Sequence, residues 1–365
     1  MKKYTALLLA LLLTLSLTAC GQTEDTGDTE WEYPAAFAGL ETLVEQAQAE
    51  GSLTVYGSCP AAYLTAACET FETLFNVRVS YQQISDQAVL DKLSKPGRPG
   101  ADVWFGADSG ALEQAASMGS LTAYVPAAAA GQSDSDFAGA DGQRYGVAVD
   151  PLGLIVNTAS LKAMEIGAPE DWADLTELEY WELVWLPGYD TTEGRLLAQA
   201  AWDAFGDKAE KYLLELDENV AQYTEDGDPA AKYVGTGECV VAVGLLSSGA
   251  AQRLENSYDD IRLVTPRSGT PYVLNGSAIL RGTAHSAAAQ LWMEYALSPI
   301  CQALAAMNGW YVWPTVENVS LPEDLAQLNV DLDGLTCRLP MGKDAEALDS
   351  LIDAVQTVLN PPAES

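Results

Sequence analysis

The chain has 365 residues, of which 18 are Lys or Arg and 52 are Asp or Glu, so its formal charge is −34. Nucleic acid would repel so acidic a chain, and we expect no local basic cluster to offset the repulsion. The hydrophobic content of 48% is typical of a folded protein, and the length exceeds what one hydrophobic core usually serves. Two domains are therefore expected.

The first twenty residues have the pattern of an export signal. Two lysines precede an apolar run, Leu7–Leu17, which falls short of the roughly 20 residues that span a bilayer. The run ends in the letters LTAC, which resemble the bacterial lipobox, whose cysteine is diacylated before cleavage. The alternative is an ordinary secretory signal that happens to contain a cysteine. We expect a lipoprotein signal peptide over 1–19 and lipidation of Cys20.

A flexible stalk is predicted over residues 20–33. Its central letters, GQTEDTGDTE, include no aliphatic side chain and four acidic ones. Such a segment cannot bury enough apolar surface to fold. The stalk would tether a folded domain to the outer face of the cell membrane, or to its periplasmic side.

The chain then alternates between strand and helix patterns. A helix is expected over 34–50. Periodicity predicts strands over 53–56, 77–81 and 101–105, and helices over 60–75, 85–93 and 109–118. This rhythm is typical of an α/β fold with a mostly parallel sheet.

A crossing into a second domain is predicted at Asp150-Pro151, which separates the β-prone segments 145–149 and 152–156. Further strands are expected over 239–243, 261–264 and 272–280, and helices after Thr191 and over 286–297, 299–307 and 344–359. The strand 272–280 would return to the first domain. We therefore expect one lobe from 34–149 and 265–365, a second lobe from 150–264, and a ligand cleft between them that closes like a clamp.

The cysteines argue against a structural zinc site, because no CxxC pair occurs and five cysteines remain besides Cys20. Cys68 and Cys239 lie in apolar patterns and are expected in the core. A disulfide between Cys301 and Cys337 is the one pairing that the sequence leaves open. No metal site is predicted.

Four places where a helix is expected to begin carry small hydroxyl or acidic residues. A helix N-terminus has unpaired amides and a partial positive charge, so it can hold an anion. Ligands of parallel α/β sheets bind at this edge. Simple helix capping is the alternative. The candidate ligand-binding residues are Ser58, Cys59, Asp108, Ser109, Thr191, Thr192, Glu193, Gly194, Arg195, Ser247 and Ser248.

Charged side chains refine this set. Arg195 would suit a phosphate or carboxylate, unless it pairs with neighbouring acids at the surface. Arg144 and Arg267 are further cationic candidates. Asp108 and Glu193 would suit an amine on the ligand.

Several segments together resemble a known family. ADVWFGADSGALEQAASMGSL, YGVAVDPLGLIVNT, VVAVGLLSSGAAQRL and GTPYVLNGSAILRGTAHSAAAQLWMEYALSPICQAL follow one another in that order. They resemble solute-binding proteins of bacterial ABC transporters with the type II periplasmic-binding-protein fold, in the branch that binds ferric iron, 2-aminoethylphosphonate, phosphoglycerate and sugar phosphates. The resemblance implies a two-lobed clamp, an ABC permease as partner and no cofactor. A monomer is expected.

The resemblance also bears on the ligand. Ferric-iron members hold the metal through adjacent tyrosines after the strand that here is 239–243, whereas residues 245–248 read Leu-Leu-Ser-Ser. In the anion-binding members, the segment that matches 191–194 contacts phosphate or phosphonate oxygens, and this chain keeps hydroxyls there. We therefore expect a small anionic solute, organophosphate-like or phosphonate-like. Ferric iron and a sensing role beside a signalling receptor are the alternatives.

An enzyme is not expected. A Ser–His–acid hydrolase would need His285, the single histidine, which we expect at the surface before a helix. No Gly-x-Ser-x-Gly, Walker or His-Glu-x-x-His motif occurs.

Overall fold

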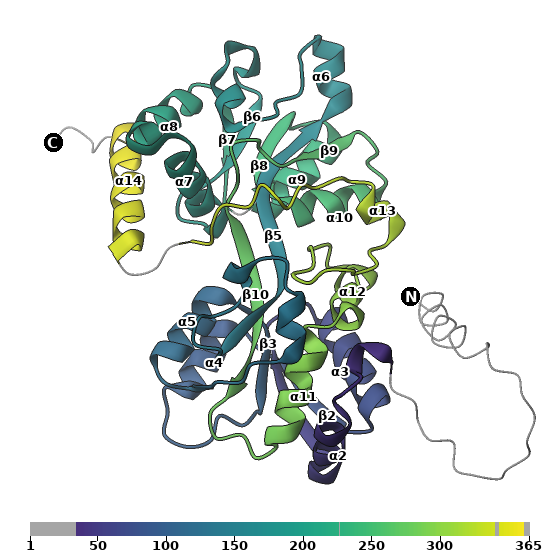
Figure 1. The fold of residues 1–365 in the computed structure, drawn as a ribbon. Helices are drawn as coiled ribbons and strands as arrows, with labels where there is room; N and C mark the ends of the chain where they lie inside the picture. Colours follow the sequence, from purple (N-terminus) through teal and green to yellow (C-terminus); the bar gives the residue numbers. More distant parts are fainter. Residues whose placement is uncertain (1–33, 226, 340–342, 361–365) are drawn as a thin grey trace, which may run out of the picture. The chain divides into compact units, whose positions relative to one another are not determined.

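The computed structural model describes residues 34–225, 227–339 and 343–360 (Figure 1). The predicted signal peptide, Cys20 and the whole of the stalk lie outside the described residues. The described residues from Thr42 on form one compact unit. Instead of one helix over 34–50, the structure has a 3-10 turn, Ala35–Phe37, and helix α2, Glu41–Glu50. Gly39 lies between them with φ 88°, a conformation that ends a helix.

The predicted strand–helix alternation is confirmed in the first lobe. Parallel strands β1, β2 and β3 lie in the order β2-β1-β3 and alternate with helices α3, α4 and α5. Helix α3 buries Leu64, Cys68, Phe71 and Phe75, the apolar face that its periodicity indicates. The bounds are Ser52–Gly57, Arg78–Gln83 and Val103–Asp108 for the strands, and Ala61–Phe75, Asp86–Leu93 and Ser109–Ser117 for the helices.

The prediction of two strands broken at Asp150-Pro151 is wrong, because one strand, β5 (Arg144–Asn157), runs through both residues. Its first part, up to Pro151, pairs with β10 (Tyr272–Leu280), and its second part, from Leu152, pairs with β8 (Val241–Leu245). Proline and the residue before it favour extended backbone, so the pair suits a strand that changes partners. β5 therefore links two groups of strands.

Strand β10 returns to the first lobe as predicted, pairing antiparallel with both β3 and β5. It also pairs with β4 (Leu121–Thr122). Helices α11 (Ser286–Ala296) and α12 (Pro299–Met307) follow it. The rings of Phe71, Phe105, Trp292 and Tyr295 pack together with centroids 5.2 to 5.6 Å apart, so α3, β3 and α11 share one aromatic core.

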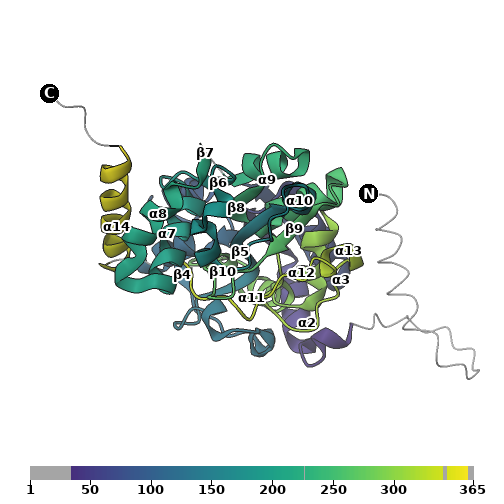
Figure 2. The same cartoon turned by 90° about the horizontal axis from the view of Figure 1, so that it is seen from above.

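The second lobe is a sheet covered on both faces. Leu154 and Val156 of β5 join the core of α7 and α8, whereas Ile155 joins the core of α9 and α10. Figure 2 shows the two pairs of helices on different sides of the strands. Its other strands are β6 (Val184–Pro187), β7 (Val220–Thr224) and β9 (Ile261–Val264). Its helices are α6 (Thr158–Met164), α7 (Thr192–Phe205), α8 (Ala209–Asp217), α9 (Gly227–Thr236) and α10 (Leu246–Asn256).

Several short elements are not predicted by the periodicity. They are α13 (Glu323–Ala326) and the 3-10 turns Ala127–Gly131, Ser135–Phe137, Trp172–Thr176, Leu178–Tyr180 and Gly206–Lys208. Within the described ranges, no helix has both the length and the apolar character needed to cross a membrane.

The last helix changes the proposed division into lobes. Helix α14 (Lys343–Leu359) packs on α7 and α8, and Figure 1 shows it beside them. Its Leu348 and Val355 are buried in the same core as Leu196 and Leu213. We therefore keep the two-lobe proposal but place α14 with residues 150–264 rather than with the first lobe.

Residues 335–338, which we call the strap, connect the two lobes. The strap lies along the start of β10, where the amide of Tyr272 donates to the carbonyl of Cys337 at 3.0 Å. The hydroxyl of Thr336 donates to Asp203 of α7 at 3.0 Å, and Arg338 donates to Glu113 of α5 at 2.6 Å. One short segment thus holds a helix of each lobe.

The five cysteines that the structure describes are free thiols, so the pairing of Cys301 with Cys337 does not form. Cys301 is buried beside the hydroxyl of Tyr63, whereas Cys337 lies near Asp203 on the strap. The burial predicted for Cys68 and Cys239 is confirmed.

Thiol labelling checks this arrangement. In the chain with Cys20→Ser and without reducing agent, we expect a maleimide to modify Cys337 first in the folded protein, because the other four thiols are buried, and all five after unfolding. Mass spectrometry of the labelled peptides counts the thiols. A disulfide-linked peptide containing Cys301 and Cys337 would contradict the structure.

Candidate ligand-binding site

The strand register brings helix starts of both lobes to the same part of β5. Asp108, at the end of β3, pairs with Asn275 of β10, which pairs with Ala148 of β5. Leu245, at the end of β8, pairs with Leu152 of β5. The starts of α5 and α10 therefore lie beside two residues of β5, Ala148 and Leu152. These two residues are only about 13 Å apart, because a strand rises about 3.3 Å per residue.

The other two predicted helix starts lie at the same two edges. β1 runs parallel to β3, and β6 runs parallel to β8, so α3 and α7 begin beside α5 and α10 respectively. The structure thus brings together the candidate residues of each lobe at one sheet edge. This is the edge at which ligands bind in parallel α/β folds.

In the first lobe, two carboxyl groups gather at the start of α5. Asp108 accepts a hydrogen bond from the amide of Gly110 at 2.8 Å, and its own amide donates to Asp86 Oδ2 at 3.1 Å. The other oxygen, Asp86 Oδ1, is buried and has no hydrogen-bond partner among the described residues. Burial raises the pKa of both carboxyl groups. Asp86 therefore offers an unused acceptor.

The neighbouring Ser58 and Cys59 are held by the protein itself. The Ser58 hydroxyl donates to the carbonyl of Ile84 at 3.0 Å and accepts from Trp104 at 2.9 Å. Cys59 is buried, and burial raises the pKa of its thiol. Cys59 is therefore a core residue rather than a surface contact.

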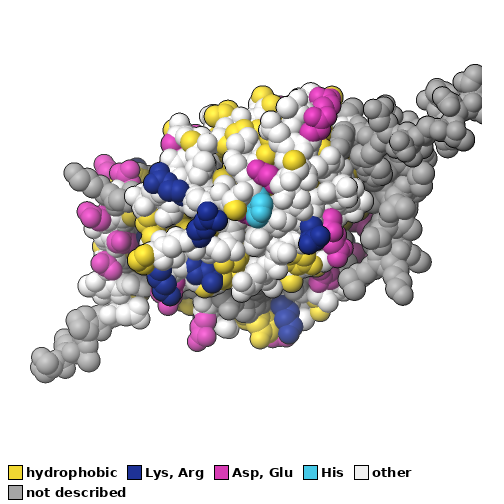
Figure 3. All heavy atoms as spheres, turned by 90° about the horizontal axis from the view of Figure 1, so that it is seen from below, with side chains coloured by type: hydrophobic (Ala, Val, Ile, Leu, Met, Phe, Trp, Pro, Cys, Tyr) yellow, Lys and Arg dark blue, Asp and Glu magenta, His cyan; other side chains and the backbone are white. Residues whose placement is uncertain are grey.

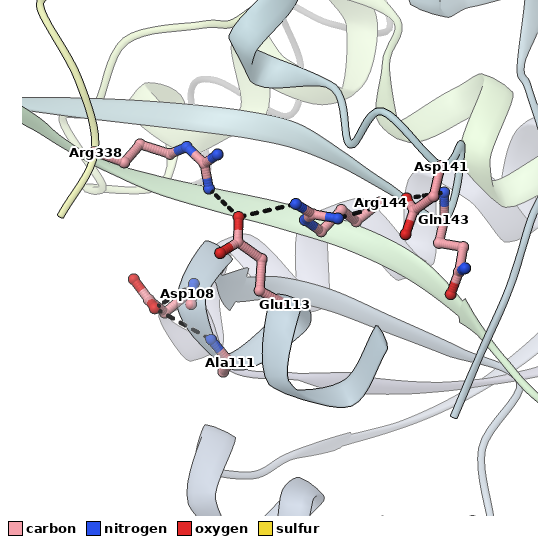
Figure 4. Close-up of polar contacts among 8 residues, drawn as sticks. Asp108, Ala111, Glu113, Asp141, Gln143, Arg144 and Arg338 are labelled. Atoms are coloured by element: carbon pink, nitrogen blue, oxygen red, sulfur yellow. Dashed lines mark hydrogen bonds and ion pairs between the residues drawn. The ribbon is translucent and has the colours of Figure 1, made fainter. Parts of the chain in front are cut away.

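A recess beside these residues contains two arginines. It is narrow, with a cavity volume of about 10 Å³, and it is lined by Ser109, Asp136, Arg144, Tyr145 and Arg338, with apolar groups of β5 and β10. Glu113 lies between the two guanidinium groups, 2.8 Å from Arg144 and 2.6 Å from Arg338 (Figure 4). Arg144 also lies 3.5 Å from Asp141, so two arginines and two carboxylates balance in charge.

The charges of this group reinforce one another. Burial alone would raise the pKa of Glu113, but the hydrogen bonds and charges of Arg338 and Arg144 outweigh it and lower that pKa. Burial likewise opposes the charge of Arg338, and Glu113 outweighs it, so the pKa of Arg338 is raised. Arg338 therefore stays charged at any physiological pH.

In the second lobe, the start of α7 is capped internally. The Thr191 hydroxyl accepts from the amide of Gly194 at 3.0 Å and donates to the carbonyl of Gly188 at 2.7 Å. A Cβ on Gly194 would clash with that same carbonyl, so packing explains this glycine. Thr192 is exposed and Glu193 is half-buried. The capping alternative therefore accounts for Thr191 and Gly194.

Two of the predicted cationic candidates are paired with acids. Arg195 lies 2.7 Å from Asp349 of α14, which is the surface pairing that the sequence left open. Arg267 pairs with Glu170. Arg144, the third candidate, is likewise paired, with Glu113 and Asp141, but it lines the recess.

The start of α10 is occupied by a carboxylate of the chain. Asp150 is buried in β5 and accepts from both the amide, at 3.1 Å, and the hydroxyl of Ser247. The Ser248 hydroxyl donates to the carbonyl of Leu245 at 2.7 Å. A ligand anion would meet the negative charge of Asp150 here, so this helix start is a poor anion site.

His285 is less exposed than predicted. Its Nδ1 lies 2.9 Å from Asp102 and its Nε2 lies 3.1 Å from the Ser52 hydroxyl. The buried Asp102 also accepts from the amide of Thr54 and the hydroxyl of Thr283, at 2.8 and 2.6 Å. These bonds tie β1, β3 and the turn before α11 together, at the sheet edge opposite the candidate site. His285 therefore holds the turn before α11 against the sheet, through Ser52 and Asp102.

Four residues of the site are absent from the sequence prediction: Asp86, Glu113, Asp150 and Arg338. Asp86 directly follows the cap residue Ser85, so its place at a helix start was the available signal. Arg338 has no such signal, because it precedes no predicted element and its partner Glu113 lies 225 residues away. Among the residues that the structure describes, no group of three or more His, Cys, Asp or Glu is placed to hold a metal ion.

Comparison with known proteins identifies the class. The model of a family described as bacterial extracellular solute-binding protein matches residues 99–333, and the chain belongs to this family. An uncharacterised protein of Haemophilus influenzae is 29% identical over 289 residues, which cover 74% of this chain and 80% of that protein. The predicted class and its extracytoplasmic location are confirmed.

Solved structures agree with this class. The periplasmic binding protein AfuA from Actinobacillus pleuropneumoniae is 26% identical, with a TM-score of 0.63 over 86% of this chain and 99% of that one. The ferric binding protein from Campylobacter jejuni is 18% identical, with a TM-score of 0.65 over 84% and 99%. The fold is therefore the two-lobed periplasmic-binding-protein fold that the sequence predicts, and the protein is the solute-binding component of an ABC importer.

Proposed function

We propose that the protein captures a small solute that carries a phosphate or another anionic group, together with hydroxyl or amine donors. The observation that supports this most is the recess at the start of α5, where Arg144 and Arg338 both contact Glu113 and line the same hollow. Planar guanidinium groups bind phosphate and carboxylate oxygens through paired hydrogen bonds. The anionic group would lie against these two arginines and Ser109.

The carboxyl groups of the first lobe would bind the rest of the solute. Asp86 Oδ1 is buried without a hydrogen-bond partner among the described residues, and a buried acceptor of this kind costs free energy until a donor reaches it. A hydroxyl or ammonium group of the solute would provide that donor. Asp108 lies near both Arg338, whose charge acts on its carboxyl group, and Asp86, which accepts a hydrogen bond from its amide. A solute with an anion at one end and donors at the other fits this order.

A relative supports a phosphorylated ligand. The AfuA structure is described with exogenous fructose-6-phosphate bound, and that compound has both an anionic group and several hydroxyls. The ferric-binding neighbours are under 20% identical, and ferric iron is the second candidate. The sequence argues against it, because Leu245-Leu246-Ser247-Ser248 stands where the iron binders have adjacent tyrosines. Ferric iron prefers such anionic oxygen ligands.

The solute would be captured by closure of the two lobes, with Thr192 and Glu193 at the start of α7 as further contacts. Cys20 would carry the lipid that holds the protein at the membrane, beside the permease that receives the solute. We further propose that the protein acts as a monomer. We also propose that it acts without catalysis, because its hydrogen-bonded group of Ser52, His285 and Asp102 lies at the sheet edge away from the site.

A ligand screen tests the proposal. The chain with Cys20→Ser, which no lipid can modify, is heated with sugar phosphates, phosphoglycerates, phosphonates, thiamine, polyamines and ferric citrate. A ligand at 100 times its Kd adds about 2.7 kcal/mol to the free energy of unfolding, which raises Tm measurably. We expect a phosphorylated or phosphonate compound to raise Tm. A rise with ferric citrate alone would overturn the anionic-solute proposal.

A further inference from the structure

The first lobe has a second cationic surface, at the end away from the candidate site. Four basic side chains line one open hollow: Lys92, Lys95, Arg98 and Arg281. Lys92 ends α4, Lys95 and Arg98 follow in the next loop, and Arg281 follows β10. Figure 3 shows several Lys and Arg side chains gathered on this side of the molecule. The expectation of no local basic cluster is wrong here, because folding joins separate segments.

None of these four side chains has an ion pair with a described residue. The ion pairs of the described chain involve other basic residues, and no Asp or Glu lines the hollow. Lys92 only lies over the ring of Tyr56, 5.5 Å from its centroid. In a chain with 52 acidic and 18 basic residues, four unpaired cations around one hollow are a marked excess of positive charge. Their mutual repulsion favours an anionic partner.

The strand register places this hollow opposite the candidate site. Val103, at the start of β3, pairs with Ile279 near the end of β10, so Pro99 and Arg281 lie beyond the start of β3. The recess with Ser109 lies beyond its other end. The six residues of β3 separate the two by about 20 Å. A partner at the hollow would leave the candidate site accessible.

The shape of the hollow indicates what kind of anion fits. None of its lining residues is buried, and its four cations are spread around an open surface rather than directed at one point. Met118, which precedes the lining residue Gly119, is an exposed apolar side chain. A single small ion would need buried donors that converge on it. An extended layer of charges beside apolar chains fits this surface better.

We propose that this basic hollow docks the protein on the anionic headgroups of the membrane. The proposal rests on the proposed function in one respect, since a lipid-tethered binding protein works at a membrane surface. A membrane touches only one face, and charges farther away than about 10 Å are screened at physiological salt. The net charge of −34 therefore does not prevent this face from binding, whereas it would repel a polyanion that wraps the molecule.

Vesicle binding tests the proposal on the full chain with Cys20→Ser. Vesicles of phosphatidylcholine are compared with vesicles that also contain phosphatidylglycerol, at low and at high salt. We expect stronger binding to the anionic vesicles, and loss of that difference at high salt. The leader with Lys2 and Lys3 is present in the parent and in both variants described next, so its contribution is equal in their comparison.

Two matched variants localise the effect. The variant K92Q/K95Q/R98Q/R281Q should bind anionic vesicles at least about tenfold more weakly, since each Lys or Arg near an anionic surface contributes severalfold. The control K162Q/K208Q/K211Q/K232Q changes the net charge equally, at exposed positions outside the hollow, and should bind as the parent does.

Three results would overturn the proposal. They are equal binding to both vesicle types, equal losses in the two variants, or a loss of binding to an anionic polymer but not to vesicles. The first variant should keep the Tm rise with the ligand found in the screen. Loss of vesicle binding with an intact ligand response separates this proposal from the proposed function.

Discussion

Replacing either arginine of the recess, as Arg144→Gln or Arg338→Gln, is expected to weaken solute binding by about 10- to 100-fold. Hydrogen bonds from a charged donor contribute about 1.5–3 kcal/mol, and 1.4 kcal/mol is a factor of ten in Kd. Glutamine keeps much of the length but loses the charge and the paired donors. Calorimetric titration with the ligand found in the screen measures the change.

Glu113→Gln provides the opposite result. The substitution removes the carboxylate that the two guanidinium groups share, so more of their charge becomes available to the solute. We expect an anionic solute to bind several-fold more tightly, although the protein itself becomes less stable at pH 7. If all three variants weaken binding alike, the recess is a structural ion-pair group and the proposed site is wrong.

The pH dependence of that stability loss follows from the lowered pKa of Glu113. A carboxyl group whose pKa is lower in the folded state stabilises the protein above its unfolded pKa, here about 4.5, and loses this effect as the pH falls through the folded value. The stability difference between the parent and Glu113→Gln should therefore be constant above about pH 5 and disappear in more acidic solution. Urea unfolding at several pH values measures it.

Asp102→Ala is expected to destabilise the protein by about 2–4 kcal/mol, a large part of the roughly 5–15 kcal/mol of a typical domain. Asp102 is buried and accepts from Thr54, Thr283 and His285. Removing the carboxylate leaves these donors without their partner and opens a cavity. The midpoint of urea unfolding should fall while its slope stays constant.

Asp91→Ala is the matched control for Asp102→Ala. Asp91 is exposed on α4 and accepts one hydrogen bond, from Gln87 at 2.8 Å. Water replaces that bond easily, so we expect a change below about 0.5 kcal/mol. Equal effects of the two substitutions would show that the bonds of Asp102 contribute little to stability.

The sequence predicts the regular elements well, because their periodicity is local. Strand β10 has its predicted bounds, Tyr272–Leu280, and α12 has its predicted bounds, Pro299–Met307. Asp150-Pro151 misleads, since proline usually ends a strand, yet here it lies where β5 changes partners. Whether a proline breaks a strand depends on its neighbours in space, which a local pattern does not contain.

The site is predicted only where it depends on helix starts. Asp108 and Thr191 carry the signature of a capping residue, and the structure confirms that each of them caps a helix. The recess depends instead on contacts between distant segments. Arg144, Glu113 and Arg338 meet only because the strap returns along β10. No spacing in the sequence encodes that meeting.

The unbroken strand β5 has a mechanical consequence for the importer. A loop between the lobes would bend freely, but a strand that pairs on both sides of Pro151 resists sharp bending, because its hydrogen bonds would have to break. The lobes would then move by gradual twisting of β5 and β10 together. If the lobes close on a solute as proposed, such a joint would store elastic energy, and that energy would help the lobes to separate again when the solute leaves.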